Sequence, residues 1–288
     1  MYNVNFGSEI ISEGMDGDSS TTLKGSGFLA GSFMNYSIEY AVLCCKGLVR
    51  KDNQDNFWCL GKFLNSTNDG LTEPITGMAE SKTFPAFAVF DGIGGEDQGE
   101  VAAFIAANRF DAAYSESQKD NTKQFLLNTC SYMNNAICRH TEQQHLKSSG
   151  STAAILMFGK KYIYVCNIGD SRVYQFSENE LVQISYDHSE TIIGRRKPPL
   201  TQSLGIPETE FIIEPYISKG KYESRDKYLI CSDGLSDMVT DDVISDILSE
   251  DTRILDCAQR LMCRAIKSGG NDNITIIVCE IHKQRRFL

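Results

Sequence analysis

Eight short runs of β-branched and aromatic residues recur along this chain, and they constrain its fold more than any other feature. The runs are bounded by Gly, Asn and Asp, which is typical of strands that end in turns. The close pair 153–159 and 161–168 indicates a β-hairpin. The complete set of runs is 37–44, 56–63, 84–90, 153–159, 161–168, 172–176, 227–233 and 273–281.

Three helical segments stand between these runs. Apolar residues recur at spacings of three and four over 126–137 and again over 254–265, and a further helix is expected at 99–114. Strands and helices therefore occur in blocks. This order, together with the hairpin, favours an antiparallel sheet in an α+β layer architecture over a doubly wound parallel sheet.

Length and charge narrow the class of protein. The chain has 288 residues, 41% of them hydrophobic and 23% charged, which is typical of a soluble globular protein with a large core. Residues 1–36 are rich in Gly, Ser and Thr and show no period, so we expect an irregular N-terminal extension followed by one domain at 37–288. The formal net charge of -10 disfavours nucleic acid and membrane as partners.

The ten cysteines lie in strand-like and helix-like segments and include no C-x-x-C pair. We expect them to be mostly buried, reduced thiols of a cytoplasmic protein without a structural zinc site. The first residues lack a basic leader and an apolar core, and no later stretch is apolar over about 18 residues. Secretion and membrane spanning are therefore disfavoured.

The stretch FAVFDGIGGEDQGE, residues 87–100, ends a strand-like run in Asp91 and follows it with three glycines. One interpretation is a turn, because glycine accepts positive φ and aspartate bonds its own backbone. The other is that the glycines let the backbone approach a metal ion or phosphate beside the carboxylate. Asp233 and Asp272 also lie at strand ends, so three carboxylates can meet at one sheet edge. Such a cluster needs a cation, and oxygen ligands favour Mg²⁺ or Mn²⁺ over zinc.

Seven motifs now extend this pattern, and their order and rough spacing are those of a known family. They are VRKDNQD, VFDGIGG, SGSTA, NIGDSR, DHS, CSDGLSD and GGNDNITIIV. The chain thereby resembles the metal-dependent serine/threonine protein phosphatases, the type 2C or PPM family, over about residues 37–283, and it is similar to the bacterial type. The resemblance implies a four-layer αββα sandwich in which helices flank two packed antiparallel β-sheets. It also implies hydrolysis of phosphoserine and phosphothreonine in phosphorylated proteins, opposite a cognate kinase in signalling.

The resemblance further implies a dinuclear site for Mn²⁺ or Mg²⁺. By motif, Asp91 matches the aspartate that bridges both ions and Gly92 supplies a carbonyl ligand, while Asp233 and Asp272 match the other carboxylates of one metal. Asp55 matches an aspartate that orients metal-bound water. Two cations about 3.5–4 Å apart lower the pKa of a shared water and hold the phosphoryl oxygens during in-line attack.

The resemblance assigns Arg50 to the substrate phosphate, and the chain departs from the family pattern at other positions. Gln54 stands where the family has a glutamate, and its amide oxygen remains a candidate metal ligand. Lys147 stands where many members have an acidic ligand of a third metal site. Asp237 matches the other carboxylate of that site, so the chain keeps only one of the two acidic ligands of the third metal site. Residues 190–200 form a flap that is shorter than is usual in the family. His188 beside this flap is either a general acid or, as we favour, a structural residue.

Two rival functions stay open at this point. A cysteine-dependent phosphatase is suggested by the C-x-x-G-x-x-R spacing, but it occurs twice, at Cys44–Arg50 and at Cys166–Arg172, without a helix after the arginine. The other rival is a catalytically silent member of the family that binds phosphoproteins. A complete set of buried acids argues against it, because such a cluster is costly without a cation.

Overall fold

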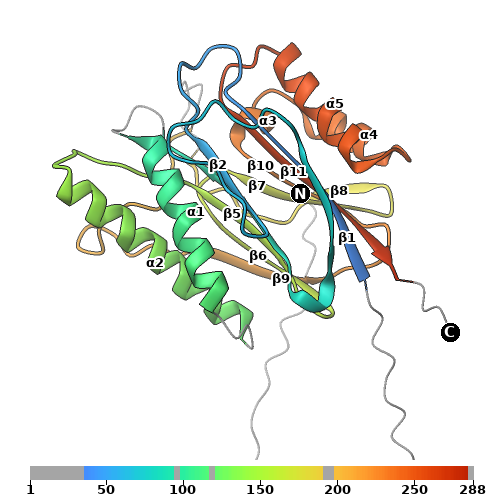
Figure 1. The fold of residues 1–288 in the computed structure, drawn as a ribbon, viewed down its shortest axis with the longest axis horizontal. Helices are drawn as coiled ribbons and strands as arrows, with labels where there is room; N and C mark the ends of the chain where they lie inside the picture. Colours follow the sequence, from blue (N-terminus) through green and yellow to red (C-terminus); the bar gives the residue numbers. More distant parts are fainter. Residues whose placement is uncertain (1–35, 94–97, 117–120, 191–197, 285–288) are drawn as a thin grey trace, which may run out of the picture. The chain divides into compact units, whose positions relative to one another are not determined.

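A computed structural model describes residues 36–93, 98–116, 121–190 and 198–284 of the chain (Figure 1). Two antiparallel sheets form its centre. The six-stranded sheet contains, in spatial order, β3 (Ile75–Glu80), β1 (Tyr36–Cys45), β11 (Ile274–Lys283), β10 (Lys227–Cys231), β7 (Arg172–Ser177) and β8 (Glu180–Gln183). The five-stranded sheet contains β2 (Asp55–Cys59), β4 (Ala86–Asp91), β5 (Ala153–Phe158), β6 (Tyr162–Ile168) and β9 (Tyr216–Lys221).

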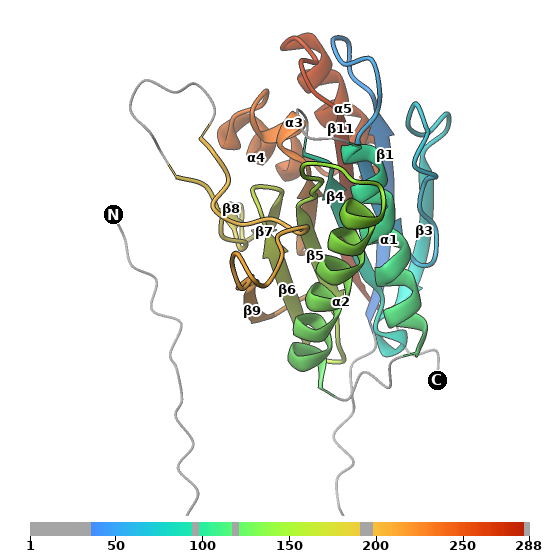
Figure 2. The same cartoon turned by 90° about the vertical axis from the view of Figure 1, so that its left-hand side faces the viewer.

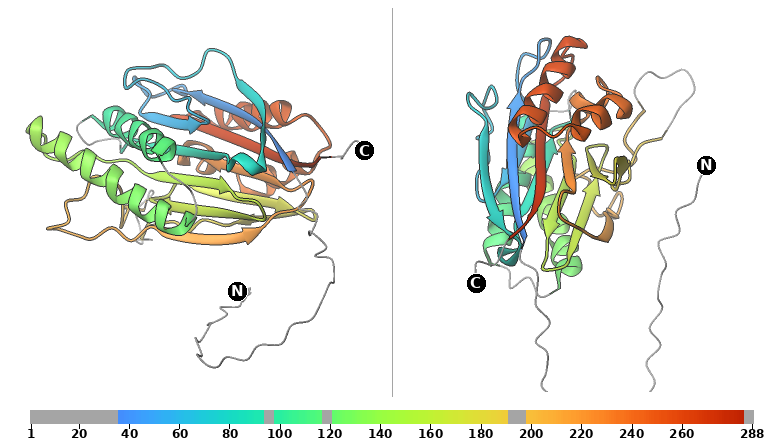
Figure 3. Two further views of the ribbon diagram at one scale, coloured as in Figure 1. Left: turned by 60° about the horizontal axis from the view of Figure 1, so that its bottom comes forward. Right: turned by 90° about the vertical axis from the view of Figure 1, so that its right-hand side faces the viewer.

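The two sheets pack face to face, and Figures 2 and 3 show them between two groups of helices. Alternate side chains of both sheets, such as Val42, Val89 and Ile277, form the core between them. The helices are α1 (Gly99–Glu116), α2 (Thr122–Gln143), α3 (Asp233–Ser236), α4 (Asp241–Ser249) and α5 (Ile254–Lys267), with a short 3₁₀ turn, η1 (Ser81–Thr83).

Each sheet buries its outer face under one helical group. Alanines of α1 lie against the five-stranded sheet, where small side chains allow close approach, and Phe110 packs edge-on against Trp58 at 5.0 Å. Apolar residues of α4 and α5, such as Leu261, cover the six-stranded sheet. The predicted α+β sandwich of four αββα layers is thus confirmed, as is the antiparallel hairpin of β5 and β6.

The predicted segments match the structure, whereas three strands, helices α3 and α4 and the turn η1 were not predicted. The helices expected at 99–114, 126–137 and 254–265 lie within α1, α2 and α5. Strands β3, β8 and β9 were not expected, and each of them is an edge strand. Tyr36 begins β1, and the rest of the predicted extension, residues 1–35, lies outside the described residues.

All ten cysteines lie in the described residues and are free thiols, most of them buried, as expected. No helix within the described residues is long and apolar enough to cross a membrane.

Strand registers place several loops at one end of both sheets. Asp55 at the start of β2 pairs with Asp91 at the end of β4, and Cys45 at the end of β1 pairs with Ile274 at the start of β11. Because antiparallel neighbours reverse direction, the ends of β1, β4 and β10 lie beside the starts of β2, β5 and β11. Described residues of motifs that are far apart in the sequence, such as Asp55, Asp91 and Ile274, are thereby brought to this end.

Candidate metal centre and active site

A cavity of about 200 Å³ opens at this end of the two sheets. Strand ends and the loops next to them line it, and three of the lining residues are the predicted aspartates Asp91, Asp233 and Asp272. The complete lining is Arg50, Gln54, Asp91, Gly92, Ile93, Thr152, Asp170, Leu200, Asp233 and Asp272. The structure therefore brings together six of the eight predicted site residues in one cavity.

Asp91 is the last residue of β4, and its backbone is held from β5. Its N–H donates to Thr152 Oγ1 at 3.1 Å, and its carbonyl accepts from Thr152 N–H at 2.8 Å. Burial and the neighbouring carboxylates, first Asp55 and then Asp233, raise the pKa of Asp91 well above its usual range. A carboxylate in these surroundings is stabilised by a cation.

Gly92 has no room for a side chain. A Cβ at this position would lie 2.2 Å from the carbonyl oxygen of Gly99 and 2.7 Å from that of Gln54. Its N–H donates to Gln54 O at 3.0 Å. Close backbone approach, and not a positive φ, explains this glycine of the DGIGG motif. The two glycines after Ile93 lie outside the described residues.

Asp55 lies behind the cavity wall and is 1% exposed. Its Oδ2 accepts hydrogen bonds from Ser232 Oγ and Thr275 Oγ1, both at 2.7 Å. Its Oδ1 is buried and has no hydrogen-bond partner among the described residues. Burial raises the pKa of Asp55 to about 7, against the two hydroxyl hydrogen bonds, which lower it.

Arg50 and Asp272 form an ion pair in the cavity, with Nη2 2.7 Å from Oδ2. This hydrogen bond is the main cause that raises the pKa of the Arg50 guanidinium. Asp233 begins α3 directly after β10 and is 4% exposed. A cation that bound Asp272 would have to compete with the guanidinium of Arg50.

These residues fit a hard metal ion, although no preformed ligand cage is present. Among the described residues, no three His, Cys, Asp or Glu side chains are placed to hold a metal by themselves. However, Asp55 Oδ1 is a buried oxygen without a hydrogen-bond partner in the described part of the chain, and burial together with the surrounding carboxylates raises the pKa of Asp91. Oxygen donors, excess negative charge and a backbone carbonyl are the donor set that Mg²⁺ and Mn²⁺ prefer.

Asp237, Lys147 and His188 lie elsewhere. Asp237 follows α3 and is exposed, Lys147 is exposed, and neither is among the residues that line the cavity. His188 is 7% exposed. Its backbone N–H donates to Gly169 O at 2.9 Å, and its ring Nδ1 accepts from the backbone N–H of Gly169 at 3.3 Å. Burial lowers its pKa. This geometry favours the structural role over the general acid.

The sequence analysis gave no site role to Ile93, Thr152, Asp170 or Leu200, although all four line the cavity. Thr152 and Asp170 belong to the motifs SGSTA and NIGDSR, so a signal for them was present. Thr152 Oγ1 also lies 2.7 Å from Ser171 Oγ, which links the end of β4 to the loop after β6. Leu200 belongs to the flap and has no local signal.

The two C-x-x-G-x-x-R matches do not form phosphate loops. Cys44 and Cys166 are buried, and burial raises the pKa of Cys44 to about 12, while a hydrogen bond with Cys130 is the main cause that raises that of Cys166. A reactive cysteine needs the opposite shift. Arg172 makes an ion pair with Asp187, with Nη2 2.7 Å from Oδ2, and so holds the DHS motif in place. The cysteine-dependent rival is therefore disfavoured.

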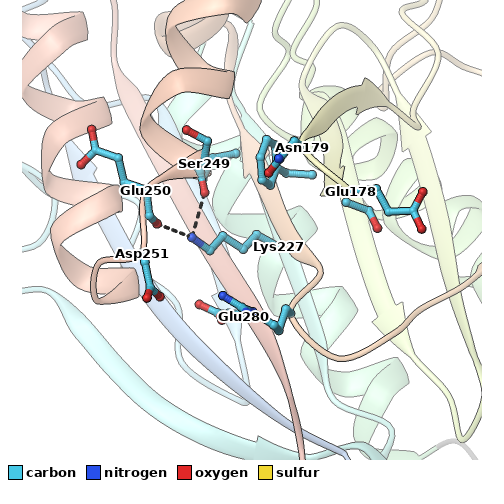
Figure 4. Close-up of a pocket in the computed structure, with 11 residues that line it drawn as sticks. Glu178, Asn179, Lys227, Ser249, Glu250, Asp251 and Glu280 are labelled. Atoms are coloured by element: carbon cyan, nitrogen blue, oxygen red, sulfur yellow. Dashed lines mark hydrogen bonds between the residues drawn. The ribbon is translucent and has the colours of Figure 1, made fainter.

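A second cavity, of about 410 Å³, lies between β7, β10, β11 and the end of α4 (Figure 4). Lys227 is 7% exposed, and its Nζ donates to the carbonyl oxygens of Leu248 and Glu250, both at 2.8 Å. These carbonyls lie at the end of a helix, where intrahelical donors are missing. Lys227 therefore caps α4, and we assign this cavity a structural role.

Asp55 makes the stability of the protein depend on pH when divalent metal is chelated. Its pKa is about 7 in the folded chain and about 3.9 in an unfolded one, so the folded state binds more protons between these values. The contribution is complete below about pH 4 and is lost as pH rises through about 7. We expect the free energy of unfolding in urea with EDTA to fall by on the order of 2 kcal/mol from pH 5 to pH 8.

Asp55→Asn should flatten this pH dependence, and added Mn²⁺ should reverse its sign by offsetting the carboxylate charges. Equal slopes in Asp55→Asn and the unaltered chain would contradict the assignment.

Comparisons with known proteins agree with this geometry. A sequence profile of protein phosphatase 2C matches residues 76–265. The chain belongs to the protein phosphatase 2C family. The serine/threonine protein phosphatase PstP of Mycobacterium tuberculosis is 27% identical over 259 residues, covering 85% of this chain and 45% of PstP. The serine/threonine phosphatase stp of Listeria welshimeri is 27% identical over 254 residues, covering 82% of this chain and 92% of that protein.

The fold of this protein phosphatase 2C chain also matches solved structures. The crystal structure of the PstP catalytic domain with two manganese ions is similar at a TM-score of 0.68 and 26% identity, over 86% of this chain and all of that one. The chain spans about half the length of PstP itself. The predicted family is thus confirmed, and nothing in these relatives favours the catalytically silent alternative.

Proposed function

We propose that this chain is a metal-dependent protein serine/threonine phosphatase that hydrolyses phosphoserine and phosphothreonine with a water activated at a dinuclear Mn²⁺ or Mg²⁺ site. The observation that carries the proposal is the meeting of Asp91, Asp233 and Asp272 with the guanidinium of Arg50 in one cavity. The three carboxylates can hold metal ions, and the guanidinium beside them can bind phosphate oxygens. Together they suit a phosphoryl group held between metal ions and arginine.

Asp91, the carbonyl of Gly92, Asp233 and Asp272 would hold the ions. When bound, the ions would supply a water of lowered pKa and positive charge for the phosphoryl oxygens. We also propose Gln54, which lines the cavity, as a metal ligand. A third metal site at Asp237 has less support, because Asp237 does not line the cavity.

Arg50 would orient the substrate. Its guanidinium presents parallel N–H donors that match two phosphate oxygens, whereas lysine offers a single point charge. Its side chain is 43% exposed at the cavity and already bonds one carboxylate oxygen. A phosphate of the substrate would replace Asp272 as its partner.

Asp55 would act through Oδ1. This oxygen is buried and has no hydrogen-bond partner among the described residues, so it can accept a hydrogen bond from a water in the site. Ser232 and Thr275 fix the other oxygen and so the plane of the carboxyl group. Asp55 would thereby orient the attacking water.

The proposed substrates are phosphorylated proteins, and a serine/threonine kinase is the proposed opposing enzyme. We place the reaction in the cytoplasm because ten free thiols suit a reducing compartment. The net charge of -10 suits neither nucleic acid nor anionic membrane as a partner.

Chelation followed by metal addition tests the proposal. We expect the chain in EDTA to leave a phosphothreonine peptide intact, and added Mn²⁺ to restore phosphate release by a factor of about 10³ or more, since metal assistance supplies several kcal/mol. Circular dichroism confirms that the protein stays folded in EDTA. A folded protein that releases no phosphate at any Mn²⁺ or Mg²⁺ concentration would overturn the proposed function.

A further inference from the structure

Gln54 enters the cavity from a backbone that is fixed on both sides. Its N–H donates to Asn273 Oδ1 at 2.9 Å, and its carbonyl accepts from Gly92 N–H at 3.0 Å. Its side chain lines the cavity together with Asp91 and Asp233. The fold therefore fixes the backbone of Gln54, and a side-chain contact has to orient its amide group.

Glu100 determines that orientation. Gln54 Nε2 lies 3.1 Å from Glu100 Oε2. An ionised carboxylate only accepts hydrogen bonds, so the nitrogen of the amide must face Glu100 and the oxygen must face away from it. Glu100 is in the first turn of α1, where the helix dipole favours a negative charge. It does not line the cavity itself, so it acts from behind Gln54.

Gly99 makes this contact possible. A Cβ at position 99 would lie 2.9 Å from Gln54 Nε2 and 3.1 Å from the backbone carbon of Gly92. Any side chain here would push the amide away from Glu100 or displace the backbone that follows Asp91. The glycine at the start of α1 thus links the helix to the cavity wall.

We propose that Glu100 is a positioning residue of the metal centre, which holds Gln54 Nε2 so that Gln54 Oε1 faces the cavity as a neutral ligand for Mn²⁺ or Mg²⁺ or for its bound water. The inference rests on the proposed metal-dependent function. Without Glu100 the amide can turn its NH₂ group into the cavity, where two donors repel a cation. Partners of this kind behind a metal ligand commonly change metal affinity by about 10–100-fold.

A double-mutant cycle on the full chain tests this inference, with the Mn²⁺ dissociation constant from calorimetry as the readout. We expect Glu100→Ala to weaken Mn²⁺ binding by about tenfold. The same substitution in a Gln54→Ala background should change it by less than about twofold, because Glu100 acts through Gln54. Glu100→Gln keeps an acceptor oxygen for Nε2 and should recover most of the affinity. Thermal unfolding in EDTA checks that each variant is folded.

The exchanged pair Gln54→Glu with Glu100→Gln has the same net charge and reverses the hydrogen bond. It should bind Mn²⁺ at least as tightly as the unaltered chain, because a carboxylate oxygen then faces the cavity. Equal losses from Glu100→Ala in both backgrounds would overturn the inference and leave the proposed function standing, since the charge of Glu100 would then act directly. If the unaltered chain binds no Mn²⁺, the proposed function and this inference both fail.

Discussion

Asp91→Asn is expected to abolish metal-dependent phosphate release while it makes the protein more stable in EDTA. Several kcal/mol of transition-state stabilisation come from metal ions, so kcat should fall by about 10³-fold or more at every Mn²⁺ concentration. The stability should rise because a neutral amide costs less to bury than a carboxylate and is not repelled by Asp55 and Asp233; burial and this repulsion are the causes that raise the pKa of Asp91. Phosphopeptide hydrolysis and urea unfolding in EDTA measure the two effects.

A substitution that lowers activity but raises the stability of the protein identifies an acid with a functional role. Substitution of a structural aspartate would instead lower the stability of the protein. Asp69→Asn is the matched control, because 85% of the Asp69 side chain is exposed. Asp69 forms an ion pair with Lys46, which lies on the loop that leads to Arg50. Asp69→Asn should alter neither quantity measurably. Turnover by Asp91→Asn at saturating Mn²⁺ would contradict the proposal that Asp91 holds the metal ions.

Arg50→Ala is expected to lower kcat/KM for a phosphothreonine peptide by about 100-fold, since two charge-assisted hydrogen bonds to phosphate are lost. Arg50→Lys should recover only part of this loss, because an ammonium group does not match two oxygens at once. Mn²⁺ affinity should stay the same or rise in Arg50→Ala, because Asp272 loses its ion-pair partner. Steady-state kinetics and calorimetry separate these two effects.

Lys46→Ala controls for the loss of a positive charge from the same loop. Lys46 binds Asp69 at 2.7 Å and does not line the cavity, so kcat/KM should change by less than about threefold. If Lys46→Ala and Arg50→Ala lower kcat/KM equally, the loop acts through its net charge and Arg50 has no specific contact with phosphate.

Local sequence predicted the central strands well and the edges of the sheets poorly. Central strands such as 227–231 and 274–283 are buried almost throughout and are therefore rich in apolar residues. The edge strands 75–80, 180–183 and 216–221 are short and combine exposed with half-buried residues, with Gly, Glu and Lys among them. Edges carry polar residues that discourage further pairing, and these residues also remove the strand signal.

The sequence by itself predicted the α+β class from its strand and helix patterns, because these patterns are local properties that each segment carries with it. Its ordered motifs, through the family resemblance, predicted the αββα sandwich and three of the four acids of the cavity, Asp91, Asp233 and Asp272. Only the tertiary structure decided how these residues meet. The ion pair of Arg50 with Asp272 joins residues 222 positions apart, and the contact of Gln54 with Glu100 joins residues 46 apart. Distances between side chains of separate elements depend on sheet register and helix packing, which no short stretch of sequence contains.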